Sequence, residues 1–139
     1  VRDLLLALAH STTVAAAAGR TRTEQLEALT QRADSALEGE FAVWLKDNGY
    51  RLPDEAQTLV EEAQARPDYV YRLASASVAV FVDGPVHQYP DVAQRDAEAE
   101  ERLFDAGWHV IRVGYDRATW PAIVAKNRTV FGAGIRSDA

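Results

Sequence analysis

Apolar residues recur along much of the chain at the three- and four-residue spacing of amphipathic helices. This pattern predicts helices over residues 2–18, 21–32, 35–48, 91–106 and 119–130. Gly19, Gly49 and Gly107 follow three of these stretches, and glycine is the most common residue just beyond a helix end. Ser35 and Glu38 form an S-x-x-E pair, which suits a capping box at the start of the third helix.

Between the helical stretches, the pattern changes to that of strands. The run Val78-Ala79-Val80-Phe81-Val82 is almost continuously apolar, as expected of a central strand that is buried on both faces. Tyr69-Val70-Tyr71 is aromatic and β-branched, and residues 74–77 resemble a hairpin connection between the two. Residues 108–113 predict a further strand, whereas residues 56–65 fit helix and strand equally well. This order of elements predicts an α/β fold with a mixed sheet flanked by helices.

The 139 residues are enough for one domain with a core and too few for two. The chain begins with Val1 inside a helical pattern, so we interpret it as part of a longer protein. We expect an N-terminal helical segment over residues 1–34, a main domain over 35–131 and a tail over 132–139. No apolar run approaches the roughly 20 residues of a membrane span, and no signal peptide is recognisable. We therefore expect a cytoplasmic protein without a membrane partner.

Composition limits the chemistry that is possible. The absence of cysteine excludes disulfides and thiolate metal sites, and the remaining ligand types favour a hard cation such as Mg²⁺. The net charge of −6 argues weakly against nucleic-acid binding, whose surfaces are usually basic. That objection is weaker for residues 66–139, which carry 9 basic against 10 acidic side chains.

Two acidic residues flank the predicted hairpin. Asp68 comes just before the first strand and Asp83 just after the second, so a short turn between the strands would bring the two together. Two such carboxylates can hold a divalent cation, which polarises a phosphodiester and lowers the pKa of a bound water. His87 follows closely and could act as a general base or as a donor to a phosphate oxygen. Taken singly, Pro67-Asp68 and Asp83-Gly84 are more often simple turns.

Several short motifs follow one another between residues 67 and 111. They are Pro67-Asp68, Val80-Phe81-Val82-Asp83-Gly84-x-x-His87, Arg95-Asp96 and Ala106-Gly107-Trp108-His109-Val110-Ile111. This ordered set resembles the very-short-patch repair endonucleases and their relatives, which have the PD-(D/E)XK restriction-endonuclease-like fold. It resembles even more closely the C-terminal endonuclease-like segment of some bacterial superfamily 2 DNA helicases. The resemblance covers residues 35–130.

The resemblance implies a metal-dependent DNA endonuclease or DNA-processing module, a hydrolase of DNA repair attached to a helicase. It implies Mg²⁺ or Mn²⁺ at Asp68 and Asp83, and DNA and the rest of the parent chain as partners. The expected catalytic residues are Asp68, Asp83, His87, Glu38 and Asp96. The expected contacts to DNA phosphates are Arg66, Arg95 and Arg112.

The sequence also departs from the family pattern. Related domains often have glutamate two positions before the Asp-Gly aspartate, where this chain has Phe81, and the signature lysine is absent around Asp83. A catalytically inactive nuclease-fold domain that binds DNA or protein is therefore the alternative, and a scaffold without nucleic acid is a third. Glu38 also fits a role limited to capping its helix. Asp96 also fits a solvent-exposed position on its helix. The three tryptophans fit core positions.

Overall fold

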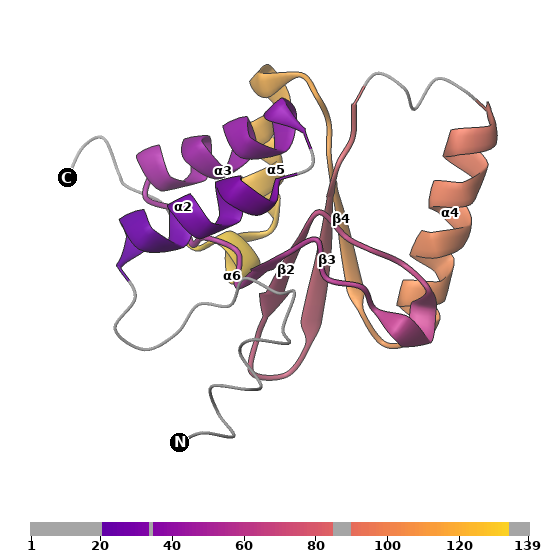
Figure 1. Ribbon diagram of the computed structural model, residues 1–139. Helices are drawn as coiled ribbons and strands as arrows, with labels where there is room; N and C mark the ends of the chain where they lie inside the picture. Colours follow the sequence, from indigo (N-terminus) through magenta and orange to yellow (C-terminus); the bar gives the residue numbers. More distant parts are fainter. Residues whose placement is uncertain (1–20, 34, 85–89, 134–139) are drawn as a thin grey trace.

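The computed structural model describes residues 21–33, 35–84 and 90–133, so the helix predicted over residues 2–18 lies outside the described residues. Figure 1 shows helices on either side of a sheet. The short 3₁₀ turns are named η. The elements are α2 (Arg22–Arg32), α3 (Ala36–Asp47), β1 (Glu55–Ala56), η1 (Glu61–Ala63), β2 (Tyr69–Arg72), β3 (Ser77–Val82), α4 (Pro90–Asp105), β4 (His109–Val113), η3 (Arg117–Thr119), α5 (Trp120–Lys126) and α6 (Arg128–Phe131).

The four strands form one mixed sheet in the order β1-β2-β3-β4. The predicted hairpin is confirmed, since β2 and β3 are antiparallel with Tyr69 opposite Val80. The Leu73 amide donates to the Ala76 carbonyl at 2.9 Å and closes the turn. Strand β4 returns parallel to β3 because α4 carries the chain back along the sheet. The predicted mixed α/β layout is therefore correct.

Helices cover both faces of the sheet, which explains the apolar run in β3. Helix α4 lies on one face, and α2, α3, α5 and α6 lie on the other (Figure 1). Alternate β3 side chains supply the two cores: Val78, Val80 and Val82 face α3 and α5, while Ala79 and Phe81 face α4. Both core faces are apolar, so β3 has no polar face.

Aromatic rings fill the core beneath α3 and α5. Trp120 is fully buried, with its ring centroid 5.0 Å from that of Phe41 and 5.6 Å from that of Trp44. Its indole N–H donates to the Gly114 carbonyl at 2.8 Å. Trp108 is buried in the other core. The prediction that the tryptophans are core residues is confirmed for Trp108 and Trp120, whereas Trp44 is partly buried and packs against the core.

Helix α2 packs on the domain that was predicted to begin at residue 35. Its N-cap Thr21 forms a capping box with Glu24, and its Leu29 is fully buried in the core beneath α3. The Gln25 amide donates to the Pro53 carbonyl at 2.8 Å. Residues 22–32 thus share the hydrophobic core of the predicted main domain.

Two segments differ from the simplest sequence prediction. The single helix predicted over residues 119–130 is divided into α5 and α6, and the turn η3 precedes α5. Asn127 leaves helical geometry between α5 and α6, and its side chain donates to the Ile123 carbonyl at 2.8 Å. The ambiguous residues 56–65 contain the end of β1, the turn η1 and an isolated bridge between Val60 and Ala65. None of the helices in the described ranges is long and apolar enough to span a membrane.

Candidate functional site

Asp68 lies at the start of β2, beside the last residues of β3. Its Oδ2 accepts a hydrogen bond from the Val82 amide at 2.7 Å, so the hairpin brings Asp68 next to the residue that precedes Asp83. Its backbone carbonyl accepts from the Gln57 amide at 3.1 Å. Antiparallel pairing therefore places this carboxylate at the end of the hairpin, as the sequence predicts.

Glu38 joins Asp68 from the first turn of α3. It is only 5% exposed, and its carboxyl group is hydrogen-bonded to that of Asp68. Ser35 caps the helix by accepting from the Glu38 amide at 3.3 Å, and its hydroxyl donates to Glu38 Oε2 at 3.1 Å. The Tyr69 hydroxyl donates to the Glu38 carbonyl at 2.7 Å and ties α3 to the sheet. Glu38 thus belongs to the helix cap and to the site at once.

Gln57 holds the two carboxylates together. Its amide nitrogen donates to Glu38 Oε1 at 2.6 Å and to Asp68 Oδ1 at 3.3 Å. Its φ of 56° is in the left-handed region, which is sparsely populated by residues other than glycine and costs of order 1 kcal/mol or more. Sequence reasoning missed Gln57, because a glutamine in a segment of ambiguous pattern carries no motif.

The environment of Asp68, which is half-buried beside the buried Glu38, controls the ionisation of its carboxyl group. Burial and, to a smaller extent, the charge of Glu38 raise the pKa of Asp68 to about 7, against the hydrogen bonds from Val82 and Gln57 that lower it. Near neutral pH, the Asp68 carboxyl group therefore carries a proton for part of the time. A cation can replace that proton, because metal ligands must be deprotonated.

Asp83 has different partners from those of Asp68. Its Oδ1 lies 2.7 Å from Arg112 Nη1, and Arg112 Nε lies 2.6 Å from Glu100 Oε1 on α4. The same guanidinium sits 4.7 Å from the centroid of the Phe81 ring. Arg112, a predicted phosphate contact, is therefore held by two carboxylates and an aromatic ring. The predicted metal site formed by Asp68 together with Asp83 stays a prediction.

A cavity of about 330 Å³ opens between η1 and α4, over Phe81. Three arginines line it: Arg66, Arg95 and Arg102. Arg102 is anchored by its Nε, which donates to the Ala63 carbonyl at 2.7 Å. The structure thus brings the predicted phosphate contacts Arg66 and Arg95 to one cavity, and it adds Arg102 from the same helix as Arg95.

A second cavity, of about 300 Å³, lies beside the carboxylate pair. It is lined by Arg32, Gln57, Leu59 and Arg66. Because Arg66 lines both cavities, and only Pro67 separates it from Asp68, the basic side chains and the acidic pair form one continuous region.

The remaining predicted residues, His87, Asp96 and His109, give less information about the site. His87 lies outside the described residues, and so does the side chain of Asp96, although its backbone is in α4. His109 is exposed at the start of β4.

Among the described residues, a hard cation would find a pair of carboxylates rather than a full set of protein ligands. No group of three or more His, Asp or Glu side chains in the described ranges is arranged to hold a metal ion. Mg²⁺, however, typically takes one or two protein carboxylates and completes its shell with waters and phosphate oxygens. Glu38 and Asp68, two carboxylates that already contact each other, meet that requirement.

Comparisons of this chain with protein-family models, curated proteins and solved structures find no match. The described residues define a mixed α/β domain with a four-stranded sheet, a buried carboxylate pair at a hairpin end and arginine-lined cavities beside it.

Proposed function

We propose that this chain is a DNA-processing domain of the PD-(D/E)XK nuclease type, in which Glu38 and Asp68 form the reactive centre. The observation that carries the proposal is the convergence of this buried pair with arginine-lined cavities at one end of the β2–β3 hairpin. The order α3-β1-β2-β3-α4-β4, with an antiparallel hairpin and a parallel last strand, supports a restriction-endonuclease-like arrangement.

Each group would have a distinct role on a bound phosphodiester. Glu38 and Asp68 would hold Mg²⁺ or Mn²⁺, which when bound supplies the positive charge that polarises the phosphate. Gln57 would keep the two carboxylates in position through its paired hydrogen bonds. Arg66 and Arg95 would neutralise neighbouring phosphates. We expect DNA affinity to be weak and to fall steeply with salt, because phosphate contacts dominate it and few cations are present.

A second function is favoured by the surroundings of Asp83. Phe81 occupies the position where related domains often have glutamate, and Asp83 is paired with Arg112. A domain with this arrangement would bind DNA without cleaving it, and a helicase in the same chain would do the work on the duplex. The two functions share the arginine-lined surface and differ in whether Glu38 and Asp68 bind a cation.

Plasmid nicking with Mg²⁺ and with Mn²⁺ tests the first function. We expect the wild type to nick DNA and Asp68→Asn to reduce nicking to background, because the substitution removes a charge that a hard cation needs. The matched control is Asp105→Asn, at an exposed position at the end of α4, which should keep full activity. Asp83→Asn reports whether the second predicted aspartate is also required.

The outcomes separate the two functions. If the wild type binds DNA in a salt-dependent manner but never nicks it, the non-cleaving function is correct. Equal nicking by the wild type and Asp68→Asn would contradict the assigned reactive centre. A wild type that neither binds nor cleaves DNA would contradict both functions.

A further inference from the structure

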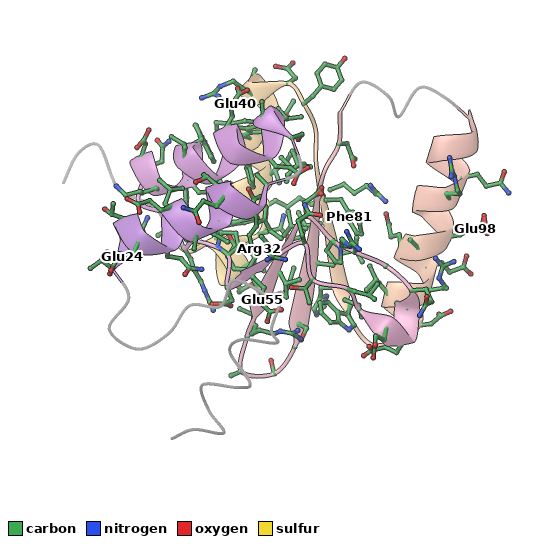
Figure 2. The ribbon with its side chains drawn as sticks, viewed as in Figure 1. Glu24, Arg32, Glu40, Glu55, Phe81 and Glu98 are labelled. Carbon is green, nitrogen blue, oxygen red and sulfur yellow. The ribbon has the colours of Figure 1, made fainter. Side chains whose placement is uncertain are left out.

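Arg32, in the last turn of α2, has an unusual environment. Its Nε atom is buried, and it has no hydrogen-bond partner among the described residues. A basic residue in the last turn is favourable for the helix dipole, but that preference does not require burial of its Nε atom. A buried donor without a protein partner is unfavourable, and in folded proteins such a donor generally binds a water or an ion. Figure 2 shows Arg32 at the end of α2 that lies beside the sheet.

The cavity beside Arg32 has the composition of an anion site. Arg66, which is exposed, supplies a second guanidinium, and Leu59 and Gln57 complete the lining. Gln57 connects the cavity with the carboxylate pair, because its amide donates to both Glu38 and Asp68. An anion in this cavity would therefore lie next to the reactive centre.

Phosphate is the anion that suits these donors. The planar guanidinium group presents several N–H donors in a fork that matches the oxygens of a phosphate, and such charge-assisted bonds are stronger than neutral ones. Positive charge here would also offset the repulsion between a DNA phosphate and the carboxylates Glu38 and Asp68.

We infer that the cavity between Arg32 and Arg66 binds a phosphate of a DNA strand, adjacent to the phosphate that faces Glu38 and Asp68. This inference rests on the proposed function and adds to it a binding residue from α2, a helix predicted to lie outside the main domain. The bound group is either an internal phosphodiester or the phosphate at a strand terminus.

Fluorescence anisotropy with a short single-stranded oligonucleotide, in EDTA and over a range of salt concentrations, tests the inference. Arg32→Gln and Arg66→Gln should each weaken binding about tenfold, because each removes charge-assisted hydrogen bonds. Each should also lower the slope of log affinity against log salt by about 0.7, the value for one phosphate contact on a single strand. The matched control is Arg128→Gln, at an exposed position in α6, which should bind like the wild type. The same series with and without a 5′-phosphate shows which kind of phosphate occupies the cavity.

Each possible result of these binding measurements supports or contradicts the inference. If the wild type binds and both cavity variants bind equally well, the inference is wrong while the proposed function stands. If the wild type does not bind at all, the proposed function and the inference fail together. Should Arg32→Gln unfold, as thermal melting would show, Arg66→Gln decides alone, since Arg66 is exposed and its loss disturbs no core contact. A loss that Arg128→Gln shares would also contradict the inference, because it would report net charge alone.

Discussion

Without divalent cations, Asp68→Asn is expected to stabilise the protein at about pH 8 by on the order of 2 kcal/mol. In the wild type, burial and the nearby Glu38 raise the pKa of Asp68 to about 7, so below that pH the folded state holds a proton that the unfolded state has already released. The folded state therefore binds more protons than the unfolded state between pH 3.8, the ordinary pKa of an aspartate, and about pH 7. Across that window, wild-type stability falls as the pH rises. Asparagine is neutral and avoids that loss.

Urea unfolding of both proteins in EDTA, at several pH values from about 3 to 8, measures this effect. The two stabilities should be similar at the acidic end, where Asp68 is protonated in both states, and should separate as the pH rises. Asp105→Asn, an exposed substitution of the same type, should follow the wild type throughout. A wild-type stability that stays constant or rises between about pH 4 and 7, with no difference from Asp68→Asn, would show that the carboxylate pair is not buried as described.

Leu29→Ala is expected to lower the free energy of unfolding by about 2–4 kcal/mol, because Leu29 is fully buried beneath α3 and its removal leaves a cavity. Leu26→Ala is the matched control, since Leu26 is in the same helix but only partly buried, and it should cost clearly less. Both substitutions change helix propensity equally, so the difference between them reports packing alone.

Chemical denaturation of the two variants measures the difference, and amide hydrogen exchange of α2 locates it. Small and equal effects would mean that α2 is separate from the folded domain, as the predicted boundary at residue 34 implies. A large effect for Leu29→Ala alone would place α2, and with it Arg32, within the cooperative unit. The outcome therefore also bears on the cavity that Arg32 lines.

Local pattern was a reliable guide to the centre of the fold. The uninterrupted apolar run over residues 78–82 predicted a strand covered on both faces, and the flanking amphipathic helices supply that cover. Asp68 was a candidate because it precedes the predicted hairpin, and Glu38 was a candidate through the family resemblance, although its spacing from Ser35 also fitted a capping role. The division of residues 119–130 was not predictable, since a side-chain bond of Asn127 interrupts a pattern that remains amphipathic throughout.

The amino-acid sequence by itself determined the main helices and strands, the hairpin and the acidic residues that flank it, because short-range periodicity and turn chemistry decide these features. Tertiary structure decided which acidic residues meet. Parallel pairing of β3 with β4 sets Phe81 opposite Arg112, and that arginine then engages Asp83. The left-handed backbone of Gln57 directs its amide between Glu38 and Asp68, and the packing of α2 through Leu29 brings Arg32 to the same place. These contacts join residues far apart in the chain. Their geometry depends on strand register and helix packing, which a local sequence pattern does not predict.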